Sequence, residues 1–385
     1  MARARYWVGL DVGADAMTCC IIDDDGGVVS DYCLANNAAD LRAILKPIRK
    51  KVSMVALESG SFGTHLTRSL VRLGFPVVQF DARKASKFLG IRQNKTDKND
   101  ARGIAEIARV GQGVVSAVRL KTLEAQNLRS ILATRQKLVR VRVAVEGIIR
   151  SLIRLNGGKF KRVTSANILV RNVTRELVRL RKDEKVDLRQ EIEPMLSLCQ
   201  TIRSYVQHTD ARLRAIAESN STCSRFMQIP GVGPICAISF YSAIDEPSRF
   251  KRSADVGAYL GMTPRMRQSG QSTSRLRISR MGSQMTRAHL VMAAGNHLQY
   301  ADSAIREWGV ALRDRAGAGR ARVAVARKLA VVMLSMWKSG QDYISRPVDS
   351  RATELNFPCG EAAGLETEPE PGDDNDPDFG IGQAC

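Results

Sequence analysis

The chain has 385 residues, 44% of them apolar, which is enough for the cores of two or three domains. Its net charge of +20 is unevenly distributed: residues 347–385 hold ten acidic residues and one arginine, so the rest of the chain carries +29. This charge favours a polyanionic partner, most often nucleic acid, over a basic surface that serves solubility alone. The longest apolar stretch, Leu329 to Trp337, is too short to span a bilayer, and the cysteines show no CxxC or zinc-like spacing. We therefore expect a cytoplasmic protein with reduced cysteines and no membrane contact.

The N-terminal region, residues 1–113, alternates strands and helices. Three short strands are expected first, followed by an apolar strand, a helix, a further strand and a second helix. In order, these elements are Tyr6 to Val12, Met17 to Asp23, Gly27 to Leu34, Val52 to Glu58, Gly63 to Leu73, Phe75 to Phe80 and Lys98 to Val110. An antiparallel meander followed by such alternation predicts an α/β domain built on a mixed sheet.

Four acidic residues occupy selected places in this domain. Asp11 lies at the end of the first strand within GLDVG, and Glu58 ends the fourth strand within ALESG. Asp97 and Asp100 lie at the start of the last helix, three residues apart and therefore on one face. Singly, such residues also suit a turn, a helix cap or a solvated surface. Together they predict a site for Mg²⁺ or Mn²⁺, in which two ions about 4 Å apart would stabilise a phosphodiester displacement.

The middle region, residues 114–222, is predicted to be helical. Apolar residues recur at three- and four-residue steps in two series, one from Leu128 to Leu155 and the other from Ile192 to Ile216. A polar connection around Gly157 and Gly158 separates them. Two long amphipathic helices favour an antiparallel hairpin or a coiled-coil partner surface, and an ordinary helical bundle explains the pattern equally well.

The third region, residues 223–346, is expected to be mostly helical and to bind phosphate. Gly231 and Gly233 precede an apolar helix from Ile235 to Ile244, an arrangement that exposes backbone N–H groups to a phosphate. Residues 268–282 read as a flexible, serine-rich loop in which a serine could attack DNA beside arginines. The basic residues expected to contact nucleic acid are Lys251, Arg252, Arg265, Arg267, Arg275, Arg277 and Arg280. Residues 347–385 form an acidic tail that we expect to be disordered and dispensable for chemistry.

A set of motifs in this order identifies a resemblance. GLDVG, ALESG, KTDKNDARGIAE, IPGVGP, FKRSADVGAYLGMTPRMRQSG and RISRMG, spread over residues 5–345, resemble the DEDD transposases of the insertion-sequence one-ten family, which are related to the pilin-gene invertases. The resemblance implies a RuvC-like, ribonuclease-H-type N-terminal domain, a coiled-coil helical middle and a helical transposase domain with a catalytic serine. It assigns Asp11, Glu58, Asp97 and Asp100 to the metal site and Ser269 to the nucleophile. Gln271 stands where many relatives have a second glycine, which leaves Ser272 and Ser274 as alternatives.

The same resemblance implies partners and a reaction. A structured bridge RNA would pair with donor and target DNA, so that base pairing reads the sequence. A homotetramer would bring the metal site of one subunit to the serine of another. Strand exchange would pass through a covalent phosphoserine and a Holliday junction.

Three other functions remain open at this point. A metal nuclease acting on branched DNA would need the four acids but not Ser269. An actin-like sugar kinase also begins with a motif such as GLDVG, although its later glycine-rich motifs are missing and +29 is unusual for it. A non-catalytic nucleic-acid scaffold would not need the intact set of acids.

Overall fold

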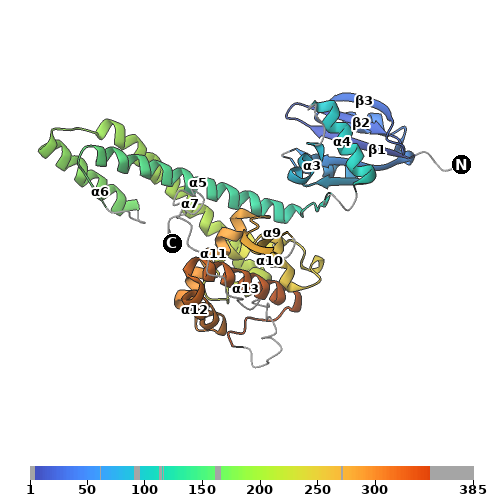
Figure 1. Ribbon diagram of the computed structural model, residues 1–385. Helices are drawn as coiled ribbons and strands as arrows, with labels where there is room; N and C mark the ends of the chain where they lie inside the picture. The colour runs from blue at the N-terminus through green and yellow to red at the C-terminus, as the bar shows by residue number, and fades with distance from the viewer. Residues whose placement is uncertain are drawn as a thin grey trace. The chain divides into compact units, whose positions relative to one another are not determined.

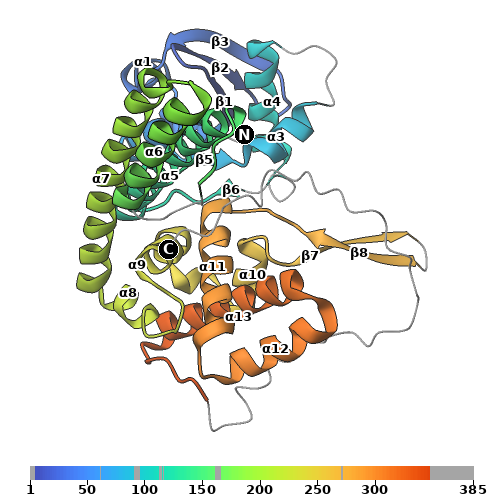
Figure 2. The same cartoon turned by 90° about the vertical axis from the view of Figure 1, so that its left-hand side faces the viewer.

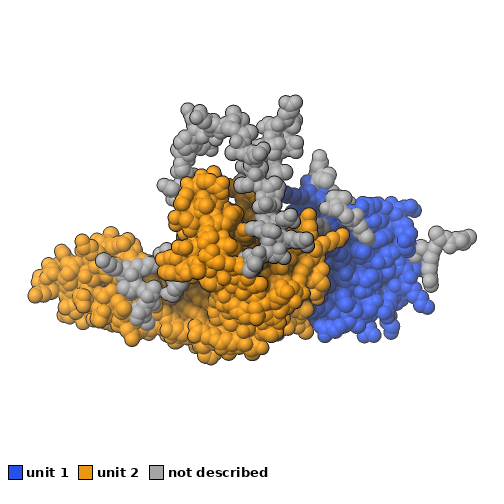
Figure 3. Space-filling model, turned by 90° about the horizontal axis from the view of Figure 1, so that it is seen from below, with its two compact units in different colours: residues 1–121 blue, residues 122–385 orange. Residues whose placement is uncertain are grey.

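The computed structural model describes residues 5–60, 62–90, 96–111, 115, 117–160, 166–269 and 272–346. The chain forms two compact units, residues 1–121 and residues 122–385 (Figure 3). The acidic tail, residues 347–385, lies outside the described residues. In the described part of the chain, no helix combines the length and the apolar character that crossing a membrane requires.

The first unit is built on a six-stranded mixed sheet. Its strands are β1 (Tyr6–Val12), β2 (Ala16–Ile22), β3 (Val28–Ala35), β4 (Val52–Glu58), β5 (Val77–Phe80) and β6 (Ala117–Val118). They lie in the order β3-β2-β1-β4-β5-β6. The meander β1–β2–β3 is antiparallel, β1, β4 and β5 run parallel, and β6 is antiparallel to β5. The mixed sheet confirms the expected α/β domain and is consistent with a DEDD nuclease-like fold.

Helices cover both faces of this sheet. They are α1 (Ala38–Leu45), α2 (Gly63–Arg72), α3 (Ala82–Leu89) and α4 (Asp97–Val110), with a 3₁₀ turn at Arg49–Lys51. Val8 and Leu10 of β1 belong to the core shared with α1 and α2. Trp7, one residue out of phase, packs with α4 on the other face. Alternate strand residues therefore face opposite helical layers, and Figure 1 shows α4 crossing the strands β1 and β2.

The second unit begins with a long helical hairpin. Helix α5 (Leu123–Leu155) leads into α6 (Ala166–Arg179), a π-helical turn (Leu180–Glu184) and α7 (Arg189–Ser219). The start of α5 shares a core with the end of α7, whereas the end of α5 packs with α6 and the start of α7. Helices α5 and α7 are therefore antiparallel neighbours, as Figures 1 and 2 show. The hairpin agrees with the sequence pattern, and a coiled-coil role remains a prediction.

The remainder of the second unit is a helical body with one β-hairpin. It comprises α8 (Ser221–Phe226), α9 (Pro234–Ile244), 3₁₀ turns at Pro247–Arg249 and Ser253–Asp255, α10 (Val256–Tyr259), β7 (Pro264–Ser269), β8 (Ser272–Ile278), α11 (Gln284–Tyr300), α12 (Ala304–Ala316) and α13 (Ala318–Ser339). Its core is centred on the apolar residues of α9 and α13, with Phe226 and Phe240 in edge-to-face contact at 5.5 Å.

The serine-rich segment differs from the flexible loop that its sequence predicted. Within residues 268–282 we expected a flexible loop, but Ser272–Ile278 forms β8, which pairs antiparallel with β7. The hairpin projects from the helices of its unit (Figure 2). Serine content suggested a loop, whereas Thr273, Leu276 and Ile278 supply the β-branched and apolar residues that suit a strand.

Candidate active site

Strand register places two of the four predicted acids side by side. Leu10 of β1 is paired with Leu57 of β4, so Asp11 and Glu58 are the next residues of two parallel neighbouring strands. Gly9 and Ala56, two residues earlier on each strand, lie on the face that α4 covers. Because strand residues alternate between faces, Asp11 and Glu58 share this face with α4.

The direction of α4 brings the other two acids to the same end of the sheet. The middle of α4, at Ala101 and Ala105, lies against Gly9. Its last turn reaches the β2–β3 turn, where Arg109 donates to the carbonyl oxygen of Asp24 at 2.9 Å. That turn lies beside the beginning of β1, since β1 and β2 are antiparallel. The first turn of α4 therefore points toward the end of β1, where Asp11 lies.

The start of α4 is set by local sequence. Thr96 is the N-cap residue, and its hydroxyl accepts a hydrogen bond from the backbone N–H of Asn99 at 3.2 Å. Asp97 and Asp100 occupy the first helical turn, where the helix dipole favours negative charge. The structure thus places all four predicted acids at one end of the sheet, on the face covered by α4.

The fit of this group to a divalent metal is partial. Carboxylate oxygens are the hard ligands that Mg²⁺ and Mn²⁺ prefer, and the four residues lie at one end of the sheet. However, among the described residues no group of three or more His, Cys, Asp and Glu side chains is arranged to hold a metal ion. The donor set therefore fits the metal by chemistry and by placement on the fold, and its side chains do not form a closed ligand shell.

Two cysteines on the neighbouring strand are not candidates for this chemistry. Cys19 and Cys20 of β2 are buried. Burial, together with the nearby Asp31, raises the pKa of each thiol to about 12. Since the thiolate is the nucleophile and metal ligand, these thiols act as small apolar residues in the core.

The predicted nucleophile belongs to the second unit. Ser269 is the last residue of β7 and is paired with Ser272, the first residue of β8, at the end of the hairpin. Gly270 and Gln271 lie outside the described residues, and the structure describes only the backbone of Ser269, Ser272 and Ser274.

The root of this hairpin is held tightly, a feature that the sequence analysis missed. A Cβ on Gly261 would lie 2.1 Å from the carbonyl oxygen of Met281, and a Cβ on Gly282 would lie 2.2 Å from that of Tyr259. Both glycines also have positive φ, of 70° and 79°. The buried guanidinium of Arg287 donates to the carbonyl oxygens of Leu260 at 2.9 Å and Met281 at 3.2 Å. The glycines on both sides of the segment that forms the hairpin are the signal that could have indicated this close approach.

The predicted basic contacts divide by location. Lys251 and Arg252 lie between two 3₁₀ turns, where Arg252 pairs with Asp255 at 3.2 Å. Arg265, Arg277 and Arg280 are exposed in or beside the hairpin. Arg267 and Arg275 lie in β7 and β8, where only their backbone is described.

The two predicted glycines differ in their surroundings. Gly231 has a φ of 90°, and a Cβ there would lie 2.5 Å from the carbonyl oxygen of Ala293 in α11, so packing requires this glycine. Gly233 is the N-cap residue of α9, and no side chain caps this helix N-terminus. A Cβ on Gly233 would meet nothing within 4 Å. Of the two, Gly233 has the surroundings that suit a phosphate contact.

Comparison with known proteins gives the class of this chain. Residues 8–156 match the IS110 DEDD transposase family model, described as "Transposase", and residues 223–308 match "Transposase IS116/IS110/IS902 family". The chain is 28% identical over 343 residues to the transposase for insertion sequence element IS1111A of Coxiella burnetii, covering 87% of this chain and 90% of that protein. It is 25% identical over 286 residues to the transposase for IS1328 of Yersinia enterocolitica, covering 72% and 81%.

These matches define a transposase, and hence a DNA-processing enzyme. The two family matches together span more than half of the chain, which belongs to the IS110 family of insertion-sequence transposases. The resemblance found in the sequence motifs is thereby confirmed, and the actin-like kinase is excluded.

Proposed function

We propose that the chain is a bridge-RNA-guided recombinase that cuts and exchanges DNA strands through a covalent phosphoserine and a Holliday junction. The observation that carries the cleavage chemistry is the placement of Asp11, Glu58, Asp97 and Asp100 at one end of the sheet. These carboxylates would hold Mg²⁺ or Mn²⁺, which supplies charge stabilisation at the attacking and leaving oxygens of a phosphodiester. Membership of the DEDD transposases supports divalent metal use.

The hairpin supplies the second part of the proposal. The Oγ of Ser269 attacks the scissile phosphorus, its hydroxyl proton passes to a base, and the P–O bond to the leaving DNA strand breaks. The deoxyribose oxygen that leaves takes up a proton, and the phosphodiester energy is kept in the serine ester. Arg265, Arg267, Arg275 and Arg277, on the same hairpin, would neutralise charge that builds on the phosphate.

Partners follow from charge and family. The net charge of +29 outside the acidic tail suits binding to the phosphate backbone of nucleic acid. We propose further phosphate contacts from Lys251, Arg252, Arg280 and the backbone at Gly231 and Gly233. We propose donor DNA, target DNA and a structured bridge RNA as ligands, in the bacterial cytoplasm. Because the acids and Ser269 belong to different units of the chain, we propose a homotetramer in which acids of one subunit act with the serine of another.

A recombination assay with purified protein tests this function. The complete reaction contains the donor and target DNA, the RNA encoded beside the gene, and Mg²⁺. We expect recombinant product that disappears after ribonuclease treatment, because base pairing supplies the specificity. Full, sequence-specific recombination after ribonuclease treatment would contradict RNA guidance.

The runner-up function is a metal-dependent nuclease acting on branched DNA without a covalent intermediate. The same four acids support it, and it makes the hairpin serine dispensable. A reaction that yields only hydrolysed ends, at equal rates in wild type and Ser269→Ala, would favour it.

A further inference from the structure

A cleft lies at the end of the helical hairpin where α5 leads into α6, and none of its lining residues has been assigned a role above. It has a volume of about 840 Å³ and is lined from α5, α6 and the connection between them. It shares Arg150 and Arg154 with a neighbouring hollow of about 400 Å³ along α5. The lining residues are Arg150, Arg154, Lys159, Phe160, Asn172, Arg175 and Glu176. Pockets that bind small molecules span about 300–1,000 Å³, so a single nucleotide is of suitable size.

Cations converge on this cleft from three segments. Arg150 and Arg154 are four residues apart on α5 and therefore share a face, Lys159 lies in the connection, and Arg175 lies on α6. Within the described part of the chain, no carboxylate pairs with Arg150, Arg154 or Arg175. Arg154 also suits the last turn of α5, where cations offset the helix dipole, but that role does not account for Arg150 or Arg175.

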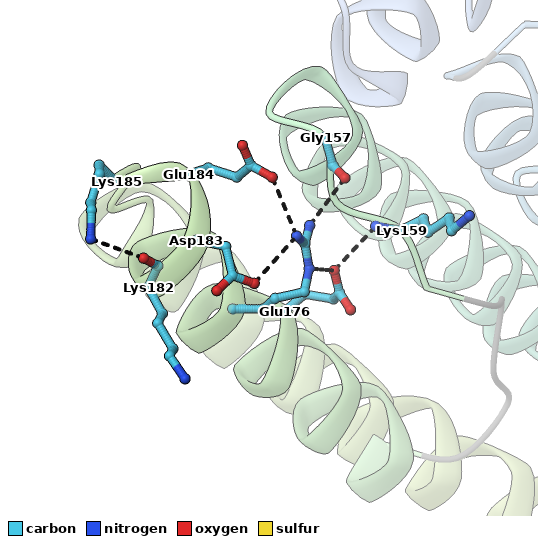
Figure 4. Close-up of polar contacts among 8 residues, drawn as sticks. Gly157, Lys159, Glu176, Lys182, Asp183, Glu184 and Lys185 are labelled. Atoms are coloured by element: carbon cyan, nitrogen blue, oxygen red, sulfur yellow. Dashed lines mark hydrogen bonds and ion pairs between the residues drawn. The ribbon is translucent and has the colours of Figure 1, made fainter.

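The acid in the cleft wall already has hydrogen-bond partners, and its partner Arg179 also pairs with Asp183 at 3.9 Å and Glu184 at 3.5 Å. Among the described lining residues, Glu176 alone is acidic, and its carboxylate accepts from Arg179 Nε and from the backbone N–H of Lys159, each at 3.2 Å. Arg179 also donates to the carbonyl oxygen of Gly157 at 3.0 Å. Figure 4 shows these contacts joining α6 to the connection that follows α5. They hold Lys159, and hence the adjacent Phe160, against the cleft.

An aromatic ring completes the site. The guanidinium carbon of Arg150 lies 5.6 Å from the centroid of the Phe160 ring. The Nε of Arg150 is buried and has no hydrogen-bond partner among the described residues. Aromatic rings interleaved with cations are typical of surfaces that bind single-stranded nucleic acid, because every base has a face that can stack. A paired base presents only its edges, so a duplex cannot use the ring in this way.

We propose that this cleft binds an unpaired nucleotide of a nucleic-acid strand, with the base on Phe160 and the phosphate on Arg150, Arg154 and Arg175. The proposal rests on the proposed function only in taking nucleic acid as the ligand, since either RNA or single-stranded DNA offers the same groups. Its α6 side belongs to residues 157–222, which neither family match covers.

Fluorescence anisotropy with the full-length protein tests the site. The probes are a short labelled oligouridine, an oligothymidine of the same length and a DNA duplex, each titrated in the presence of a metal chelator. The test variant is Arg150→Gln with Arg175→Gln. The matched control is Arg140→Gln with Arg171→Gln, which removes the same charge from exposed positions on the same two helices. Thermal unfolding of each variant verifies that the fold is retained.

We expect the test pair to bind single strands about tenfold more weakly. The slope of the logarithm of the binding constant against the logarithm of the salt concentration should become shallower by roughly 0.7 for each phosphate contact that is lost. Phe160→Leu should also weaken single-strand binding about tenfold, whereas Phe160→Tyr should retain it, since stacking needs the ring. Duplex binding should be unchanged in all variants. Equal losses for oligouridine and oligothymidine mean that the base and phosphate suffice; a loss for one alone identifies the strand that the cleft serves.

Two results would overturn the proposal. Equal weakening by the control pair would mean that the arginines act only through the overall charge. Wild-type affinity in Phe160→Leu would mean that no base stacks in the cleft. The measurements contain no free divalent metal and report binding alone. Their outcome is therefore independent of whether the protein cleaves DNA or is guided by RNA.

Discussion

Gly9 of β1 lies so close to α4 that a Cβ at this position would be 2.0 Å from the carbonyl oxygen of Ala101. The same Cβ would be 2.4 Å from the backbone nitrogen of Ala105. Both obstacles are backbone atoms of a helix, which cannot rotate away as a side chain can. The absence of a side chain at Gly9 therefore sets the height of α4 above the sheet, and with it the position of Asp97 and Asp100 relative to Asp11 and Glu58.

Gly9→Ala should consequently destabilise the first unit and misplace α4. Overpacking in a well-packed interior costs about 1–3 kcal/mol, and a backbone obstacle places this site at the upper end. We expect a lower midpoint of thermal unfolding and a loss of DNA cleavage larger than the loss of folded protein. Gly319→Ala is the control, because a Cβ there meets nothing within 4 Å. An unchanged unfolding midpoint in Gly9→Ala would refute the packing argument.

Asp11→Asn should abolish strand cleavage while leaving nucleic-acid affinity nearly intact. The substitution keeps the shape of the side chain and removes one charged oxygen ligand, so metal binding weakens at the site alone. The matched control is Asp15→Asn, an exposed acid in the turn after β1, which should cleave at the wild-type rate. Cleavage of labelled DNA and anisotropy measure the two properties separately. Full recombination by Asp11→Asn would remove Asp11 from the metal site.

Removal of divalent metal should reproduce the phenotype of Asp11→Asn in the wild-type protein. Chelation should stop cleavage, and added Mg²⁺ or Mn²⁺ should restore it, because both are hard cations suited to carboxylate oxygens. Ca²⁺ should leave nucleic-acid binding unchanged and should not restore comparable cleavage, since its larger and more variable coordination shell suits the reaction less well. Cleavage that persists after exhaustive chelation would exclude metal catalysis.

The mixed sheet could be predicted from the alternating strand and helix patterns. The position of Asp11 and Glu58 at one end of the sheet could be predicted as well, because each lies at the end of its strand. The bounds Tyr6 to Val12 and Val52 to Glu58 agree with β1 and β4. The ends of parallel strands meet at the same end of a sheet, so Asp11 and Glu58 could be placed together. The direction of α4 could not be derived in this way, because it depends on the close approach at Gly9.

Three helices, α1, α3 and α6, were not predicted from the sequence. Helices α1 and α3 have eight residues each, and α3 buries only Ala85, so neither gives a clear periodic pattern. Helix α6 was not predicted between the two helical series, although Leu169, Val173 and Leu177 recur at four-residue steps. The cleft at Phe160 therefore could not be foreseen, since one of its walls is this helix.

His297 should make the second unit less stable below neutral pH. The ring is fully buried, and its Nδ1 lies 2.7 Å from the carbonyl oxygen of Pro230 while its Nε2 lies 2.8 Å from Ser303 Oγ. A carbonyl only accepts, so Nδ1 donates and the neutral ring accepts from Ser303. Burial lowers the pKa of His297 below its ordinary 6.5. Its stabilising contribution is therefore complete above pH 6.5 and is lost as the pH falls toward the lowered pKa.

The comparison that isolates this residue is wild type against His297→Gln, which cannot titrate. Burial and the nearby Arg135 also lower the pKa of His289, to about 4, so part of the pH dependence will remain. We expect the unfolding midpoint of the variant to fall less than that of wild type between pH 8 and pH 5. Parallel curves would show that His297 does not contribute.

Ser269→Ala should remove both recombination and a covalent protein–DNA adduct. A serine ester forms only if its Oγ displaces a DNA oxygen at phosphorus, so an alanine leaves nothing for the strand to join. Trapping the reaction on donor DNA and separating the products on a denaturing gel detects the adduct. Ser272→Ala and Ser274→Ala are the controls, since both belong to β8 of the same hairpin and should retain it. An adduct that survives in Ser269→Ala and disappears in Ser272→Ala would move the nucleophile across the end of the hairpin, where the two serines are paired. If no variant and no wild-type reaction ever yields an adduct, while DNA is still cut, hydrolysis by the metal site alone is the mechanism.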